Sequence, residues 1–320
     1  MPNCTLLAAT LGLAACLPLQ AFAQTPAWPP AASHTTINLW PNSPSSSAPD
    51  PVPTNGPEAD LTKPTDNLIA GKPLVHLGNV STPTLTIYAP QGQNTGATVV
   101  VFPGGGYNIL AIDLEGTEVC DWLNAKGITC ILVKYRVPNT GPYLTKSPAA
   151  LEDAQRAVGI VRSHAAEWHI DPARIGVLGF SAGAHLAAAL STHYDKRLYP
   201  AIDAADQQSC RPDFAVIVYP GYLADADHSF LDKLDIHPTA QTPPTFIVQA
   251  EDDPVHIENS TTYFLALKAA KVPAELHIYS EGGHGYGLRP RPNWPVTTWP
   301  ARVEDWLHTI HILQPSFQSR

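Results

Sequence analysis

Stretches of apolar residues alternate with polar breaks along most of the chain beyond residue 66. Two continuous runs rich in β-branched residues, at 97–102 and 128–135, are typical of strands covered on both faces. Between 148 and 168 the apolar positions instead recur with helical spacing, from Leu151 to Val161 along one face. The pattern therefore predicts strands and helices that follow one another.

The same criteria place the remaining elements. Strands are predicted at 84–88, 174–180, 214–219, 245–250 and 274–279, and helices at 115–126, 182–194, 257–270 and 296–312. Strands that alternate with crossover helices form a mostly parallel central sheet with helices on both faces. We therefore expect a single α/β domain over residues 67–320.

The first 66 residues depart from this pattern. Residues 6–19 are apolar and uncharged, and Ala21-Phe22-Ala23 supplies the small residues that precede signal-peptidase cleavage, so residues 1–23 are predicted to be a signal peptide. The alternative is a bacterial lipobox ending at Cys16, which would become a lipid anchor. Either interpretation predicts a secreted or periplasmic protein, and neither predicts stable membrane insertion. Residues 24–66 are rich in Pro and Ser and read as an extended segment, with one strand candidate at 36–40.

Composition narrows the choice of architecture and partner. Hydrophobic residues make up 44% of the chain, enough for a large core, whereas 33 prolines among 320 residues are too many for a long helical bundle. The formal net charge of −9 argues against nucleic acid or an anionic membrane surface as the main partner, because phosphate groups attract basic surfaces.

Cleavage after Ala23 would leave three cysteines, Cys120, Cys130 and Cys210. Three cysteines do not make a disulfide framework, and no pair has C-x-x-C spacing. A bridge between Cys120 and Cys130 is conceivable, but we favour three small buried residues.

Residues 179–183 read Gly-Phe-Ser-Ala-Gly, a G-x-S-x-G motif between a predicted strand and a predicted helix. A sharp corner at this place leaves no room for side chains at Gly179 and Gly183 and presents the Ser181 hydroxyl above the sheet edge. The alternative is a turn that merely tolerates glycine. We predict that Ser181 is a nucleophile.

A serine nucleophile needs a base and an acid that orients the base. His284 lies in a glycine-rich loop after the strand at 274–279, and Asp253 follows the strand at 245–250 just before a proline. Both loops fall at the carboxyl ends of parallel strands, where ligands bind. We predict His284 as the base and Asp253 as the acid, with Asp252 and then Glu251 as alternatives.

The strand at 97–102 runs into Pro103 and three glycines, whose amides can approach a substrate closely. We predict an oxyanion hole formed by the N–H groups of Gly105, Gly106 and Ala182. The glycine runs have neither the spacing of a P-loop nor that of a dinucleotide site, and no metal-ligand motif occurs, so no cofactor and no metal are expected. A group of charged residues is expected to form ion pairs that tie helices to the sheet: Glu115, Asp153, Arg156, Arg162 and Arg174.

With these motifs the chain resembles the α/β-hydrolase superfamily, specifically bacterial secreted esterases of the acetylxylan-esterase-like or dienelactone-hydrolase-like type. The matching segments are Leu39-Trp40-Pro41, Pro103 to Tyr107, Glu115-Gly116, Lys134-Tyr135-Arg136, Asp171 to Gly176, Gly179 to Leu186, Glu258-Asn259-Ser260 and Gly282 to Gly285. The resemblance implies an α/β-hydrolase fold and a catalytic triad of Ser181, Asp253 and His284. Pro103 stands where many hormone-sensitive-lipase-type relatives carry histidine, which separates this chain from that branch.

The expected function is hydrolysis of short-chain esters, acetyl esters above all, on a small molecule or a polysaccharide such as acetylated xylan. No long apolar insertion that could form a lipase lid interrupts the strands, and Tyr107, Tyr219, Tyr222 and Tyr286 fall on loops expected to rim the site and bind substrate. The alternatives are a feruloyl-type esterase, a prolyl-oligopeptidase-like peptidase, or a non-catalytic carbohydrate-binding or interaction protein.

Overall fold

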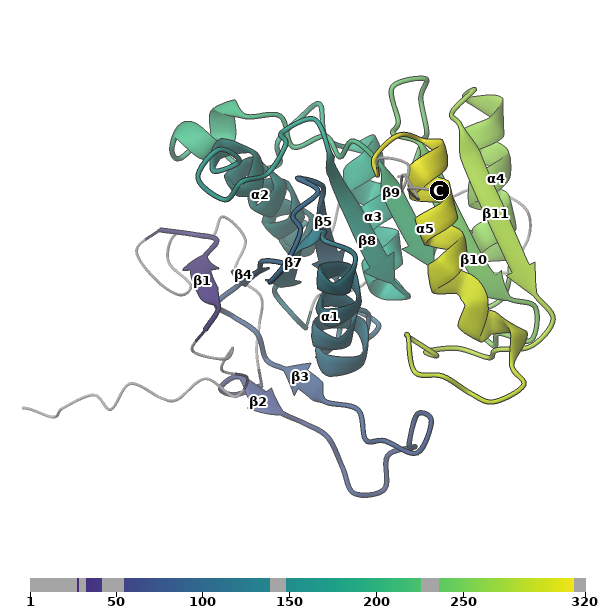
Figure 1. The fold of residues 1–320 in the computed structure, drawn as a ribbon. Coiled ribbons are helices and arrows are strands. Elements are labelled where there is room, and N and C mark those ends of the chain that lie inside the picture. The colour runs from purple at the N-terminus through teal and green to yellow at the C-terminus, as the bar shows by residue number, and fades with distance from the viewer. Residues whose placement is uncertain (1–27, 29–32, 42–54, 139–147, 226–235, 314–320) are drawn as a thin grey trace, which may run out of the picture.

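A computed structural model describes residue 28 and residues 33–41, 55–138, 148–225 and 236–313 (Figure 1). The predicted signal peptide at 1–23 and the lipobox cysteine, Cys16, lie outside the described residues. No helix in the described ranges is both long and apolar enough to cross a membrane.

An eight-stranded sheet forms the centre of the molecule (Figure 1). Its strands are, in spatial order, β1 (Thr35–Asn38), β4 (Thr84–Tyr88), β7 (Thr129–Lys134), β5 (Thr98–Phe102), β8 (Ile175–Phe180), β9 (Ala215–Val218), β10 (Thr245–Ala250) and β11 (Ala274–Tyr279). The two pairings at the β1 edge are antiparallel and the other five are parallel. The strands β5 and β8 are buried along their whole length, as their apolar sequences require. The sheet confirms the predicted mostly parallel α/β architecture.

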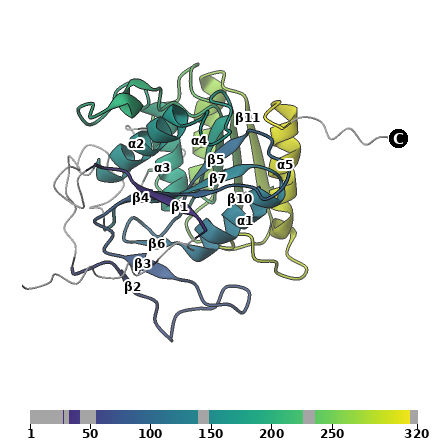
Figure 2. The same cartoon turned by 60° about the vertical axis from the view of Figure 1, so that its left-hand side comes forward.

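Helices cover both faces of the sheet. The helices are α1 (Glu118–Ala125), α2 (Ala149–Ser163), α3 (Ala182–Thr192), α4 (Glu258–Ala269) and α5 (Trp299–Thr309), with short helical turns at Asp113–Thr117, Ala204–Gln207 and Pro295–Thr298. Figure 2 shows α1 and α5 on one face and α2, α3 and α4 on the other. The predicted helix at 115–126 thus divides into a π-helical turn, Asp113–Thr117, and α1.

A second, three-stranded antiparallel sheet was not predicted. It joins β2 (Ala59–Asp60), β3 (His76–Gly78) and β6 (Ile109–Ala111). Strands of two or three residues are too short to show alternation in the sequence. Both β1 and β2 belong to the Pro/Ser-rich stretch at 24–66, and each pairs with a strand that comes later in the chain.

The chain reverses its direction across the sheet at β5. It passes from β5 to β7 on one side through α1, and then through α2 to β8 on the other side. In sheets of this kind, ligands bind beyond the carboxyl ends of the strands at such a reversal. The turn after β5 and the turn after β8 lie side by side there, since Phe102 pairs with Gly179.

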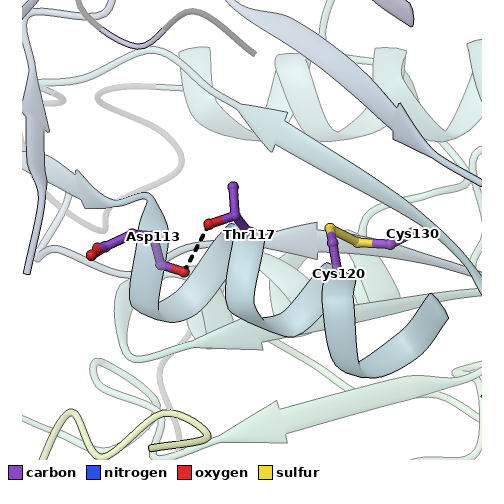
Figure 3. Close-up of a disulfide and its surroundings, with 4 residues drawn as sticks. All are labelled: Asp113, Thr117, Cys120 and Cys130. Carbon is purple, nitrogen blue, oxygen red and sulfur yellow. Dashed lines mark hydrogen bonds between the residues drawn. A yellow bond between two sulfur atoms is a disulfide. The ribbon is translucent and has the colours of Figure 1, made fainter. Parts of the chain in front are cut away.

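Cys120 and Cys130 form a disulfide that joins α1 to β7 (Figure 3). Our preference for three unbridged cysteines was wrong for this pair. The packing of α1 on β7 brings the two Cα atoms to 5.1 Å, a separation that a disulfide spans without backbone movement. Cys210 is a buried free thiol, as expected.

Replacing both Cys120 and Cys130 with alanine is expected to lower the free energy of unfolding by about 2–3 kcal/mol, because the bridge closes a loop in the unfolded chain. The two cysteines are 10 positions apart. Urea titration of both proteins measures the loss. Cys210→Ala serves as the control, since it removes a buried sulfur but no bridge. An unchanged urea midpoint when reductant opens the wild-type bridge would contradict this expectation.

Candidate active site

The G-x-S-x-G motif forms the corner between β8 and α3. Ser181 has a φ of +52° and a ψ of −116°, a conformation that side-chain-bearing residues rarely adopt. A Cβ at Gly179 would overlap the carbonyl of Gly183, and a Cβ at Gly183 would overlap the carbonyl of Phe102. Strained backbone of this kind persists where the surrounding structure enforces it, and it often marks a functional site. The Ser181 side chain is partly exposed, above the carboxyl end of the sheet.

The structure brings Ser181, His284 and Asp253 into one hydrogen-bonded chain. The Ser181 Oγ lies 2.9 Å from Nε2 of His284. The Nδ1 atom of the same imidazole lies 2.9 Å and 3.0 Å from the two carboxylate oxygens of Asp253. With the proton on Nδ1, the imidazole donates to Asp253 and accepts from the serine hydroxyl. Asp253 is 4% exposed and His284 keeps about a quarter of its side chain accessible.

Two neighbouring aspartates have different surroundings. Asp253 accepts hydrogen bonds from the Val255 amide at 2.7 Å and from Nε2 of Gln249 at 2.9 Å, which fix its carboxylate toward the imidazole. Asp252 is exposed, and its Oδ1 accepts from the amides of Gly282 and Gly283 at 2.9 Å and 2.7 Å. Asp252 therefore shapes the loop that carries His284, whereas Asp253 contacts the imidazole itself.

The turn after β5 lies against the serine corner. A Cβ on Gly104 would lie 2.6 Å from the Phe180 carbonyl oxygen and 2.9 Å from Cβ of Ser181. Tyr135 fixes the start of the turn by donating its hydroxyl hydrogen to the Pro103 carbonyl at 2.6 Å. No residue in the described ranges accepts a hydrogen bond from the three amides predicted for an oxyanion hole, those of Gly105, Gly106 and Ala182.

Glu115 was expected to form an ion pair, and this was wrong. Its carboxylate, 4% exposed, accepts hydrogen bonds from the Gly104 amide at 2.7 Å and from the Tyr219 hydroxyl at 2.8 Å. Burial raises the pKa of Glu115, and the two hydrogen bonds partly oppose that effect. The sequence contains one sign that Glu115 is buried: it stands between Leu114 and Gly116, neither of which is polar.

The other four charged residues of that group do form ion pairs. Asp153 contacts Arg136, Arg156 contacts Asp203 and Asp206, Arg162 contacts Asp213, and Arg174 contacts Asp171. Among the described residues, no group of three or more His, Cys, Asp or Glu side chains could hold a metal ion.

Three of the tyrosines expected on the rim lie buried instead. Tyr107 and Tyr286 are each 2% exposed and Tyr219 is 0% exposed. Their rings pack against neighbouring aromatic side chains, as Tyr219 does on Tyr286 at 4.5 Å between centroids. Tyr222 remains 37% exposed, and its hydroxyl lies 3.8 Å from the position that a Cβ on Gly106 would take.

Several known hydrolases are similar to this chain in sequence and in fold. The family model BD-FAE matches residues 85–219. The crystal structure of an acetyl ester-xyloside bifunctional hydrolase from Caldicellulosiruptor lactoaceticus is 33% identical with a TM-score of 0.68, over 87% of this chain and 97% of that one. An alpha/beta hydrolase enzyme from a Medee basin deep-sea metagenome library is 25% identical with a TM-score of 0.57, over 71% of this chain and 92% of that one.

A curated relative leads to the same group. An acetylxylan esterase of Xylanibacter ruminicola is 31% identical over 246 residues, which make up 69% of this chain. This chain spans about half of that relative's length, 49%. The match to the Caldicellulosiruptor lactoaceticus hydrolase, by contrast, extends over nearly all of that protein. The chain belongs to the α/β-hydrolase superfamily, among the esterases of the acetylxylan-esterase type.

Proposed function

We propose that this chain is a serine esterase that hydrolyses short-chain carboxylic esters. The observation that carries the proposal is the hydrogen-bonded chain from the Ser181 hydroxyl through His284 to the buried Asp253 carboxylate. A serine hydroxyl is a weak nucleophile unless an oriented base takes its proton. This arrangement supplies both the base and the group that orients it.

The reaction then proceeds in two steps. The Ser181 Oγ attacks the ester carbonyl carbon while Nε2 of His284 takes the hydroxyl proton, and Asp253 stabilises the resulting imidazolium. The amides of Gly105, Gly106 and Ala182 hold the negative charge on the carbonyl oxygen. When the tetrahedral intermediate collapses, the alcohol leaves with the proton from His284. Water activated by the same imidazole then attacks the acyl group, and the carboxylic acid and free Ser181 are released.

We propose further that the preferred acyl group is acetyl and that the alcohol is a carbohydrate such as xylan. Tyr222 supports the first part, because its ring stacks near Tyr107 and its hydroxyl lies beside Gly106, so that the side chain fills space next to the proposed oxyanion amides. The names of the relatives, an acetylxylan esterase and an acetyl ester-xyloside hydrolase, support both parts.

A panel of 4-nitrophenyl esters from acetyl to octanoyl, together with acetylated xylan and feruloylated arabinoxylan, tests this function. The acetyl ester is expected to have a kcat/KM at least roughly tenfold above that of the octanoyl ester, since the proposed site would have to exclude the longer chain. A higher kcat/KM for octanoyl would contradict a short-acyl pocket. If acetyl esters are cleaved but acetylated xylan releases no acetate, only the proposal of a polysaccharide substrate is wrong.

Export of the chain is also a proposal. The small-residue pattern that ends at Ala23 supports it, and so does the disulfide between Cys120 and Cys130, because disulfides persist mainly in oxidising compartments. Mass spectrometry of the mature N-terminus would distinguish cleavage after Ala23 from lipid attachment at Cys16.

A further inference from the structure

Glu115 is a buried carboxylate without an ion-pair partner among the described residues. It is 4% exposed, and no basic side chain of the described residues pairs with it. Taking an anion out of water costs free energy unless hydrogen bonds or an opposite charge compensate. Two hydrogen bonds supply this compensation for Glu115, and they join it to the turn beside the candidate nucleophile and to Tyr219.

One carboxylate oxygen holds the turn that carries the proposed oxyanion amides. Oε2 accepts from the Gly104 amide at 2.7 Å. Gly104 packs against the serine corner with no room for a Cβ, and its own carbonyl accepts from the Ala111 amide at 3.0 Å. A displacement of this amide would therefore move Gly105 and Gly106 relative to Ser181.

The other oxygen reaches the loop that carries His284. Oε1 accepts from the Tyr219 hydroxyl at 2.8 Å, and the same hydroxyl oxygen accepts from the Gly287 amide at 3.2 Å. The Tyr219 ring also packs edge-on against the His284 imidazole, with 5.0 Å between centroids. Through Tyr219, the carboxylate thus fixes both the backbone of this loop and one face of the imidazole.

We propose that Glu115 is a positioning residue that sets the oxyanion turn and the His284 loop at the correct distance from each other. It touches no reacting atom and acts through Gly104 and Tyr219. The inference rests on the proposed esterase function. A carboxylate suits this task, because its two oxygens accept from the Gly104 amide and the Tyr219 hydroxyl at once.

Three variants of the full chain test this role: Glu115→Gln, Tyr219→Phe and, as a matched control, Tyr199→Phe. Glutamine keeps the volume of glutamate, but its amide nitrogen faces one of the two donors. Tyr199 is also a buried tyrosine that donates at 2.8 Å to a carboxylate, that of Asp206, but it packs on Trp40 and contacts none of the candidate site residues.

For each variant we would measure kcat and KM with 4-nitrophenyl acetate, the Ki of ethylboronic acid, and Tm. Ethylboronic acid bonds to the serine oxygen, which passes its proton to the imidazole, and the resulting tetrahedral boronate carries a negative charge near the oxyanion amides. Glu115→Gln is expected to lower kcat by about 100-fold, since small misplacements of a site can cost that much. KM is expected to change little, and the Ki to rise along with the loss in kcat.

Tyr219→Phe is expected to lose about tenfold in kcat, because it releases the His284 loop but leaves the Gly104 hydrogen bond in place. Tyr199→Phe is expected to keep the wild-type kcat and Ki. Tm of Glu115→Gln is expected to be close to that of Tyr199→Phe, because each variant loses one buried hydrogen bond to a carboxylate. Equal kcat values for Glu115→Gln and Tyr199→Phe, or losses that follow Tm alone, would overturn the inference. A wild-type chain that neither cleaves the ester nor binds the boronate would overturn the proposed function instead.

Discussion

Ser181→Ala is expected to lower kcat for 4-nitrophenyl acetate by about 10⁶-fold, the loss typical of a serine nucleophile that acts as a unit with its base. The physical reason is that no covalent acyl intermediate can form without Oγ. His284 can then act only on water, and water is not held at the position of the lost oxygen. Initial rates measure the loss, and a fluorophosphonate probe followed by peptide mass spectrometry identifies the labelled residue.

Ser191→Ala is the matched control for that experiment. Ser191 is 0% exposed on α3, the helix that follows Ser181, and its Oγ donates to the Ala187 carbonyl at 2.8 Å. This variant is expected to retain both activity and labelling. If the probe modifies a residue other than Ser181, or if Ser181→Ala hydrolyses the ester at a rate near that of Ser191→Ala, the proposed nucleophile is wrong.

Asp253→Asn is expected to lower kcat by about 10⁴-fold, because an amide at this position holds the imidazole in the wrong tautomer. The Asn side chain would donate a hydrogen toward Nδ1 of His284, so the ring proton moves to Nε2. That nitrogen could then no longer accept the proton of the Ser181 hydroxyl, from which it lies 2.9 Å. Steady-state kinetics of the purified variant measure the effect.

The adjacent Asp252→Asn provides the comparison. Its carboxylate accepts from two backbone amides of the His284 loop, and no hydrogen bond among the described residues joins it to the imidazole, so a far smaller loss is expected. An equal or larger loss for Asp252→Asn would reverse the assignment of the acid. Wild-type kcat in Asp253→Asn would exclude a role for that carboxylate in orienting His284.

The parts of the fold that local sequence determines were predictable. The strands at 84–88, 245–250 and 274–279 have the predicted bounds in the structure, since each is a short run rich in strand-forming residues that ends at turn-forming residues. The approach of Ser181, His284 and Asp253 could also be predicted, because each follows a parallel strand and such strands end at the same edge of the sheet.

The features that the sequence did not reveal depend on contacts between distant segments. Glu115 and Tyr219 are 104 positions apart, and nothing near either residue indicates the other. The Cys120–Cys130 bridge depends on the packing of α1 against β7. The burial of the Tyr107 side chain likewise depends on its hydrogen bond to Nδ1 of His185. Local pattern predicts an element, whereas the partner of a buried polar group depends on the assembled core.

The close backbone contacts around Ser181 limit how this site can vary during evolution. A side chain at Gly104, Gly179 or Gly183 would collide with backbone atoms of the two turns, so a single substitution at any of these glycines cannot be accommodated. Relatives with a different substrate range would therefore have to diverge elsewhere. Tyr222 is such a position, because its side chain is 37% exposed and its hydroxyl lies beside Gly106. A library for directed evolution of acyl preference gains more from residue 222 and its neighbours than from the glycine turns.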